Sequence, residues 1–178
     1  MRSCCESSFF PARGNVVSAS GGELGVRPLS VDDAAVMAVV LADPSLYCYT
    51  GGAPPSEAEL TQRYSSMVRG TSPDGREEWI NLLVTLDGQP IGYVQATVAD
   101  GGEVAEIAWV IGRQWQGRGY AKQAVGLLVA DVRGRGVCRV IAHIHPDHRA
   151  SQRVAEAAGL SATDDLIDGE VRWVGAIR

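Results

Sequence analysis

A glycine-rich stretch between an apolar run and a predicted helix is the feature of this sequence best suited to chemistry. Residues 109–121 read "WVIGRQWQGRGYA", and Gly117 and Gly119 stand where a predicted strand passes into a helix. Glycine lets the backbone turn tightly and removes the Cβ atom, so that another group can lie close to the chain. The first N–H groups of a helix have no partner inside it, and the helix dipole adds partial positive charge there. Such a turn suits a diphosphate bound through backbone N–H groups, with Arg118 and Lys122 adding charge.

Two other phosphate-binding patterns do not fit this stretch. The Walker pattern GxxxxGK[ST] is absent from the sequence. The dinucleotide fingerprint GxGxxG fails, because Lys122 stands where its third glycine would be. A plain glycine turn that enters a helix is the alternative, so the neighbouring elements must decide between the two interpretations.

The predicted elements place this turn after a meander of three strands. Ser30 and Ser56 precede the first two helices, and Glu59 completes a capping box with Ser56. The Asp87-Gly88 and Gly101-Gly102 pairs mark hairpin turns. The predicted strands and later helices are 23–29, 78–86, 90–98, 103–111, helix 117–133, 137–145, helix 150–159 and 168–177, with an extra short strand near residue 162. This order predicts a mixed α/β (α+β) fold with a mostly antiparallel sheet, helices on both faces and one parallel pair from the unit 103–145.

Composition places the chain among single-domain globular proteins. It has 178 residues, 46% of them hydrophobic, and a formal net charge of −5. We expect residues 1–21 to form a flexible arm and residues 22–178 to form one domain. No apolar run is long enough to cross a bilayer, and the negative charge argues against a general nucleic-acid binder. No CxxC pair occurs, Cys138 is expected in the core, and a cytoplasmic location is the default.

The glycine stretch and two further segments resemble the GNAT superfamily of N-acetyltransferases. "QGRGYA", residues 116–121, matches the motif Q/R-x-x-G-x-G/A, which binds the diphosphate of acetyl-coenzyme A in that family. "EIAWVIGRQW" and "PDHRASQRVAEAAGL", residues 146–160, are also similar to family segments. The resemblance is to the Rim-like branch that acts on ribosomal-protein N-termini, with its antibiotic- and metabolite-modifying relatives. It covers roughly residues 25–177 in element order and is specific from Glu106 to Leu160.

The resemblance implies direct acetyl transfer from acetyl-CoA to an amine in a ternary complex, without a metal. The strand that ends at Ile111 would splay from its parallel neighbour to admit the pantetheine arm, and the Ile111 N–H would stabilise the oxyanion. His148 and Ser151 would contact the cofactor, although the family commonly has asparagine where His148 stands and Ser151 has an alternative as a helix-start hydroxyl. Arg118 and Lys122 would contact the diphosphate, or alternatively they are only solvated charges on the helix surface. The residues implied for the diphosphate are Gln116, Gly117, Arg118, Gly119, Tyr120, Ala121 and Lys122.

Glu106 is the candidate catalytic base, with Glu103 as the alternative. Side chains alternate along a strand, so the face of Glu106 depends on whether a bulge precedes Ile111. The frequent family tyrosine that serves as general acid falls at Ala155, which carries no proton to donate. The thiolate would then leave unassisted, or another group would help.

The acceptor amine is a small molecule, an antibiotic-like amine or a protein N-terminus. Candidate acceptor-binding residues are Tyr47, Tyr49, Trp79 and Asn81, the aromatic ones having an alternative as core or loop anchors. Many relatives dimerise, so a homodimer is also considered. A non-catalytic acyl-CoA sensor and a nucleotide-binding α/β protein are the competing functions. The run "HIHPDH" offers an alternative zinc site, but it meets no fixed metal spacing.

Overall fold

A single mixed sheet runs through the described part of the chain. The computed structural model describes residues 16–19, 22–99 and 101–177, and eight described strands lie in the order β1-β2-β3-β4-β5-β6-β8-β7. β5 and β6 are parallel, and every other neighbouring pair is antiparallel. The predicted mixed α/β fold with one parallel pair is therefore confirmed. The strands are β1 Val16–Ala19, β2 Gly22–Pro28, β3 Glu78–Leu86, β4 Gln89–Val98, β5 Val104–Ile111, β6 Arg139–Ile144, β7 Ser161–Ile167 and β8 Glu170–Ala176.

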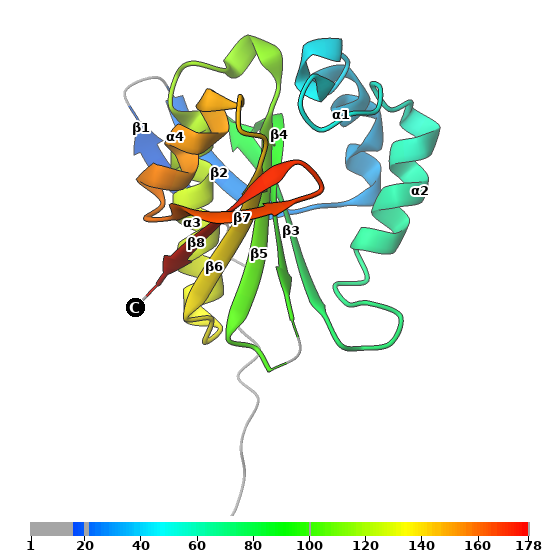
Figure 1. The fold of residues 1–178 in the computed structure, drawn as a ribbon. Coiled ribbons are helices and arrows are strands. Elements are labelled where there is room, and N and C mark those ends of the chain that lie inside the picture. Colours follow the sequence, from blue (N-terminus) through cyan, green and yellow to red (C-terminus); the bar gives the residue numbers. More distant parts are fainter. Residues whose placement is uncertain (1–15, 20–21, 100, 178) are drawn as a thin grey trace, which may run out of the picture.

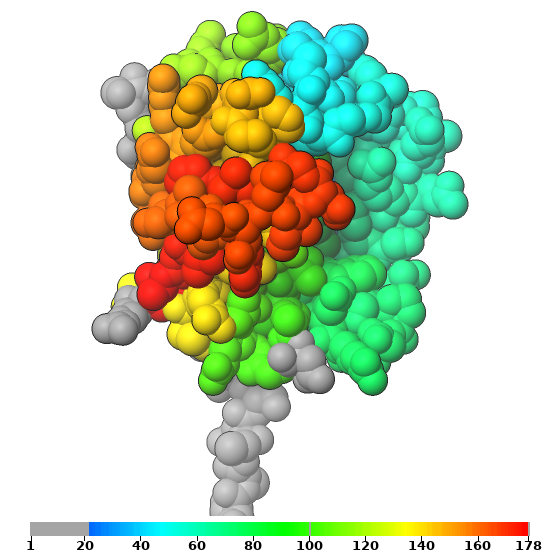
Figure 2. Space-filling model, viewed as in Figure 1, coloured from blue at the N-terminus to red at the C-terminus, as the bar shows by residue number. Residues whose placement is uncertain are grey.

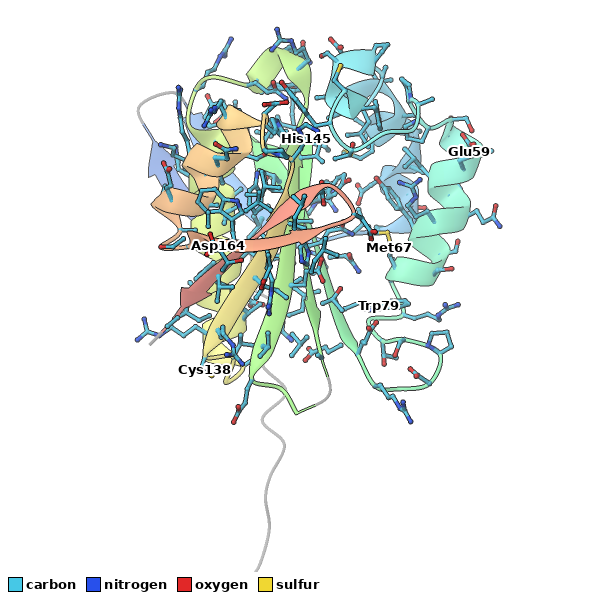
Figure 3. All side chains as sticks on the ribbon, in the orientation of Figure 1. Glu59, Met67, Trp79, Cys138, His145 and Asp164 are labelled. Atoms are coloured by element: carbon cyan, nitrogen blue, oxygen red, sulfur yellow. The ribbon has the colours of Figure 1, made fainter. Side chains whose placement is uncertain are left out.

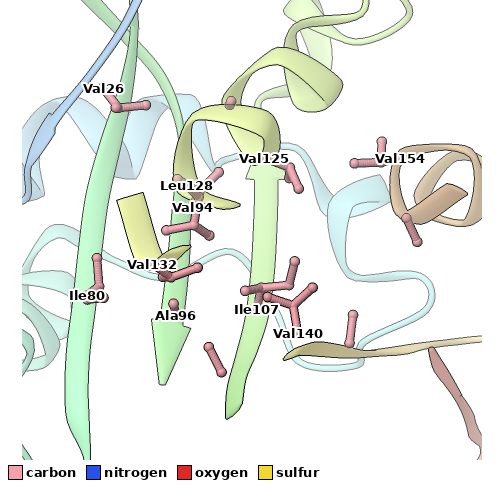
Figure 4. Close-up of a cluster of buried hydrophobic side chains, with 14 of the residues drawn as sticks. Val26, Ile80, Val94, Ala96, Ile107, Val125, Leu128, Val132, Val140 and Val154 are labelled. Carbon is pink, nitrogen blue, oxygen red and sulfur yellow. The ribbon is translucent and has the colours of Figure 1, made fainter. Parts of the chain in front are cut away.

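Helices cover both faces of the sheet, with α1 and α2 on one side and α3 and α4 on the other (Figure 1). On the face we call the α3 face, Leu128 and Val132 of α3 pack into a buried cluster with Ile107 and Val140 (Figure 4). On the α1–α2 face, a second cluster joins both helices to Leu83. No helix in the described ranges is long and apolar enough to cross a membrane. The helices are α1 Ala34–Val40, α2 Glu57–Met67, α3 Tyr120–Gly134 and α4 Arg149–Ala157, with short 3-10 helices η1 Val31–Asp33, η2 Pro44–Tyr47 and η3 Arg113–Trp115.

The residues that predict helix caps and hairpin turns form these caps and turns in the structure. The Ser56 hydroxyl accepts a hydrogen bond from the Glu59 N–H at 3.3 Å, and the Glu59 carboxylate accepts one from the Ser56 N–H at 2.7 Å. Asp87 and Gly88 have φ of 50° and 80°, as a two-residue hairpin turn with the twist of its strands requires. Helix α3 begins at Tyr120, three residues later than predicted, because the glycine turn precedes the helix.

The strand expected near residue 162 is confirmed, whereas the N-terminal segment and Cys138 differ from the expectations. The expected arm lies mostly outside the described residues, but its described part, β1, pairs with β2 and belongs to the sheet edge. The short strand expected near residue 162 is β7, whose seven residues form a hairpin with β8. Cys138 is exposed and was wrongly placed in the core, since it precedes β6 and its Sγ lies 3.4 Å from the Glu103 carbonyl oxygen.

Asp33 stabilises the entry to α1, and replacing it is expected to destabilise the fold. Burial alone would raise the pKa of Asp33, but hydrogen bonds from Arg27 and from the Ser30 N–H, with the Arg27 charge, lower it below the ordinary 3.8. We expect Asp33→Asn to lower the free energy of unfolding by about 1–3 kcal/mol at pH 7, since bonds to charged groups are lost while Arg27 stays partly solvated.

This loss should disappear in acid. A lowered native pKa gives stability that is present above the unfolded pKa and is lost as the pH falls through the native pKa. Urea unfolding of the wild type and Asp33→Asn should therefore converge below pH 3.8. Asp32→Asn is the matched control, because Asp32 is exposed and should change little. A constant difference between Asp33→Asn and the wild type down to pH 2 would contradict this account.

Candidate active site

The parallel strands β5 and β6 stay paired only over their first residues. The pairs are Val104–Arg139, Ala105–Val140 and Glu106–Ile141, and the described residues of β5 and β6 pair no further. β5 nevertheless continues to Ile111 and β6 to Ile144, each held by its other neighbour. The strands therefore part after Glu106, and this opening is called the fork below.

Glu106 lies on the α1–α2 face, beside the fork. β5 pairs with β4 without interruption from Ala105 to Ile111, so no bulge alters the alternation of its side chains. Ala105, Ile107 and Ile111 are buried with α3, and Glu106 is therefore on the opposite face, with 54% of its side chain exposed.

The Ile111 N–H points into the fork. The next N–H, that of Gly112, donates to the Ile91 carbonyl of β4 at 2.8 Å, and successive amides of a strand point to opposite edges. The Ile111 N–H and carbonyl therefore both face β6. The Gln116 side chain donates to the Ile111 carbonyl at 2.9 Å, which leaves the N–H as the group turned toward the opening.

The glycine turn presents open backbone at the start of α3. Gly117 and Gly119 have φ of 76° and 82°, which L side chains rarely adopt. Apart from the adjoining residues, no atom of the described chain lies within 4 Å of a Cβ placed on either one. Gly119 is the N-cap of α3, and Arg118 and Lys122 are exposed beside it. The Tyr120 side chain is buried at 5% exposure, so a ligand on this turn meets the backbone there and the two cations.

Gln116 is hydrogen-bonded within the protein through both its side chain and its backbone. Its side-chain amide bonds the Ile111 carbonyl, and its backbone N–H donates to the Arg113 carbonyl at 3.3 Å. The side chain thus ties the glycine turn to the end of β5.

Tyr49 and His148, expected on the acceptor and cofactor sides, contact each other. The rings stack with centroids 4.5 Å apart, and His145 lies 5.2 Å from Tyr49. Burial lowers the pKa of His148, and the nearby His145 adds to this effect. Ser151 lies one turn along α4 and is half-buried. The loop between α1 and α2 therefore meets the turn between β6 and α4 at the upper end of the sheet, where His145 is labelled (Figure 3).

The other expected acceptor residues lie on the α1–α2 face, but their polar groups are already bonded. The Tyr47 hydroxyl donates to the Leu41 carbonyl at 3.0 Å, and the Trp79 indole N–H donates to Glu77 at 2.9 Å. Tyr47 thus anchors its own loop. Trp79 lies opposite Thr97, which in turn lies opposite Glu106, so Trp79 is two strands away from the fork.

Asn81 and Gln95 form a polar chain across this face. Asn81 donates to the Met67 carbonyl at 3.1 Å, and its oxygen accepts from Gln95 Nε2 at 2.7 Å. Gln95 lies opposite Ala108 of β5, which is exposed beside the fork. Sequence reasoning missed Gln95, because its pairing with Asn81 depends on a bulge between β3 and β4.

A pocket between α2 and strands β3 and β4 adjoins this chain. Asn81, Gln95, Arg63 and Tyr64 contribute its polar lining, and its volume including the open mouth is about 330 Å³. The Tyr64 hydroxyl is buried and has no hydrogen-bond partner within residues 16–19, 22–99 and 101–177, and burial raises its pKa. Figure 2 shows the surface hollowed between α2 and the tip of the β7–β8 hairpin.

The three histidines of "HIHPDH" do not gather around one point, because His143 has a different partner from the other two. His143 Nδ1 lies 3.1 Å from Glu106 Oε1, whereas His145 and His148 lie against Tyr49. In the part of the chain that the structure describes, no three His, Cys, Asp or Glu side chains gather as metal ligands would. Ala155, at the position of the family tyrosine, is fully buried in the core.

Comparison with known proteins agrees with this arrangement. A model of the acetyltransferase (GNAT) domain matches residues 23–161. No curated protein sequence matches the chain. The GNAT domain of S. lividans PAT is 25% identical, with a TM-score of 0.76, over 94% of this chain and 99% of that one.

Two further solved structures share the fold. RimJ of Mycobacterium smegmatis, in complex with CoA-disulfide, is 18% identical with a TM-score of 0.78, over 92% of this chain and 86% of that one. AAC(6′)-Ib, in a complex that contains acetyl-CoA, is 21% identical with a TM-score of 0.71, over 86% of this chain and 93% of that one. The family match spans most of the chain, and the forked parallel pair and the glycine turn lie inside it. The chain therefore belongs to the GNAT acetyltransferases.

Proposed function

We propose that the protein transfers the acetyl group of acetyl-CoA to an amine by direct attack in a ternary complex. The observation that carries this proposal is the fork, into which the Ile111 N–H points beside an open glycine turn. A thioester in the fork would place its carbonyl oxygen by that N–H, and the diphosphate would lie on the turn.

The cofactor side comprises the turn and the start of α4. The backbone from Gly117 to Ala121 supplies hydrogen-bond donors, and Arg118 and Lys122 supply positive charge. Gln116 holds the turn to β5, as its bond to the Ile111 carbonyl supports. His148 and Ser151 would border the pantetheine arm, with His148 held in place by Tyr49.

Glu106 is proposed as the base. It accepts a proton from the acceptor ammonium, directly or through one water, and the free amine attacks the thioester carbonyl carbon from the α1–α2 face. The Ile111 N–H stabilises the charge on the carbonyl oxygen until the carbon–sulfur bond breaks. Ala155 provides no proton, so the sulfur leaves as a thiolate, which its modest basicity permits. The second proton of the amine passes to water as the amide forms.

The acceptor is proposed to lie in the hollow between α2 and the β7–β8 hairpin. Gln95 donates its side-chain N–H to Asn81, so its side-chain oxygen Oε1 is directed away from Asn81. The small side chain of Ala108 leaves space beside this oxygen. Tyr49 and Trp79 border the two ends of this region, and Tyr47 supports the loop that carries Tyr49. A small-molecule amine and a peptide N-terminus both meet these requirements. A homodimer and a cytoplasmic location stay predictions.

A non-catalytic acyl-CoA sensor is the second candidate. Ala155 favours it, because the position of the family acid is buried and carries no proton. Turnover separates the two. Incubation with acetyl-CoA and a panel of a small amine, kanamycin and an N-terminal peptide should release free thiol with at least one acceptor. Binding of acetyl-CoA without thiol release across a wide panel would support the sensor.

Acetyl-CoA is expected to stabilise the folded protein. A ligand at 100 times its Kd adds about 2.7 kcal/mol, which for a chain of this length raises Tm by about 5–10 °C. Thermal unfolding with CoA, acetyl-CoA, ATP and NAD measures this, and desulfo-CoA tests the diphosphate contribution without the thiol. A shift with ATP or NAD but not with CoA would contradict the proposal.

A further inference from the structure

We propose that His143 is a positioning residue for Glu106, and that the two side chains form a bridge across the mouth of the fork. This inference rests on the proposed function, because it assigns the orientation of the proposed base to a second residue. The sequence offered His143 only as part of an alternative zinc site.

The bridge lies where the backbone pairing of β5 and β6 ends. The last pair is Glu106–Ile141, and His143 is the next residue of β6 with its side chain on the same face. Its Nδ1 reaches Glu106 Oε1 at 3.1 Å, so a side-chain bond continues across the gap that the backbone bonds leave. The Glu106 carboxylate is 54% exposed, and a carboxylate so exposed takes many orientations unless a partner holds it.

The surroundings of His143 indicate which of its nitrogens carries the proton. Nε2 is buried and has no hydrogen-bond partner among the described residues. An ionised carboxylate only accepts hydrogen bonds, so the nitrogen that faces Glu106 must be the donor. A second proton on Nε2 would be a buried N–H donor without a partner, which costs about 1–3 kcal/mol. The proton therefore belongs on Nδ1, which donates to the Glu106 carboxylate.

The charged side chains around His143 come from β5 and from β8. Arg172 of β8 lies directly opposite His143 and pairs with Asp165 of β7 at 3.5 Å, and His145 follows on the same face of β6. A second positive charge on His143 would face the Arg172 guanidinium. The neutral donor leaves the bridge with a single negative charge, which is attractive to an ammonium acceptor.

The bridge gives the proposed base a fixed direction. One oxygen of Glu106 accepts the His143 bond, which leaves the other for the acceptor proton. A misplacement of a reacting group by about 1 Å can cost 100-fold in rate, so this orientation should appear in kcat.

Two substitutions of His143 test the role. The side-chain amide N–H of asparagine stands where Nδ1–H stands in histidine, whereas leucine has no donor. We expect His143→Leu to lower kcat 10- to 50-fold with the KM for acetyl-CoA within twofold, and His143→Asn to stay within threefold of the wild type. In a Glu106→Gln background, His143→Leu should cost less than twofold more. Equal losses for the two variants, or losses that multiply with Glu106→Gln, would overturn the positioning role.

An NMR measurement that does not depend on activity tests the bridge even if a variant fails to fold. It also separates this inference from the proposed function. The ¹⁵N chemical shifts of His143 in the wild-type protein should show a protonated Nδ1 and an unprotonated Nε2, and Glu106→Gln should change the Nδ1 shift. The opposite tautomer would overturn the bridge even if the enzyme is active. A wild type without turnover on any amine refutes the proposed function, and the catalytic use of the bridge with it.

Discussion

Replacement of Glu106 by glutamine is expected to lower kcat by about 100- to 1,000-fold, since general base catalysis contributes about 10²–10⁴. Glutamine keeps the size of the side chain and an oxygen that can accept the His143 bond, but it cannot take a proton from the ammonium. The glycine turn and the Ile111 N–H are untouched, so the Kd for acetyl-CoA and Tm should stay at the wild-type values. Steady-state kinetics and calorimetric binding of acetyl-CoA measure the three quantities.

Glu103→Gln is the matched comparison, because Glu103 was the alternative base. Glu103 lies outside β5 and before the fork, where its carbonyl accepts the N–H groups of Cys138 and Arg139. Its carboxylate is exposed, and we expect Glu103→Gln to retain most of the wild-type kcat. A Glu106→Gln enzyme that keeps a third of its kcat would remove Glu106 from the reaction, and a large loss in Glu103→Gln would replace it.

The local parts of the fold could be predicted because each signal acts within a few residues. Ser56 and Glu59 form their capping box from a spacing of three. Asp87-Gly88 forms the turn between β3 and β4, because both residues tolerate positive φ. These signals separate the helices and strands along the chain and so give their order. The strand–helix–strand unit at residues 103–145 then predicts the single parallel pair.

The register across the sheet could not be predicted, and it decides which residues share a site. A plain hairpin from the Asp87-Gly88 turn would pair Asn81 with Val94. The bulge at Val84/Thr85 shifts the pairing by one residue and brings Gln95 opposite Asn81 instead. The sequence could not decide on which face of the sheet Glu106 lies, because it does not show whether β5 has a bulge. The uninterrupted pairing of β5 with β4 places Glu106 on the α1–α2 face.

Contacts between distant segments were also beyond the sequence. Tyr49 and His148 were each expected at the site, yet their stacking joins two loops about a hundred residues apart, and no pattern encodes it. The His143–Glu106 bridge likewise depends on where two strands stop pairing. Single residues of one motif could be selected as candidates from the sequence, whereas pairs of residues that meet only in the folded chain could not.

Gly119→Ala should raise the Kd for acetyl-CoA by about 10- to 100-fold, which corresponds to a loss of about 1.4–2.8 kcal/mol. Gly119 has φ of 82°, so alanine adds strain of about 1–2 kcal/mol and places a methyl group in space that the protein leaves open. If that space holds the diphosphate, the methyl group displaces the ligand and tilts the N–H groups at the start of α3. Calorimetric titration of acetyl-CoA measures the loss.

Gly159→Ala is the control that separates the effect of backbone strain from the effect of blocking the ligand site. Gly159 has the same φ of 82°, also has no atom within 4 Å of an added Cβ, and lies past the far end of α4. Both variants should therefore lose a few degrees of Tm, about 2–4 °C per kcal/mol of strain, but only Gly119→Ala should weaken binding. If both variants bind acetyl-CoA like the wild type, the diphosphate does not lie on this turn, and the proposed path of the thioester into the fork loses its anchor. If both bind equally weakly, backbone strain reaches the site through the fold, and the glycine at position 119 has no direct role in contact with the cofactor.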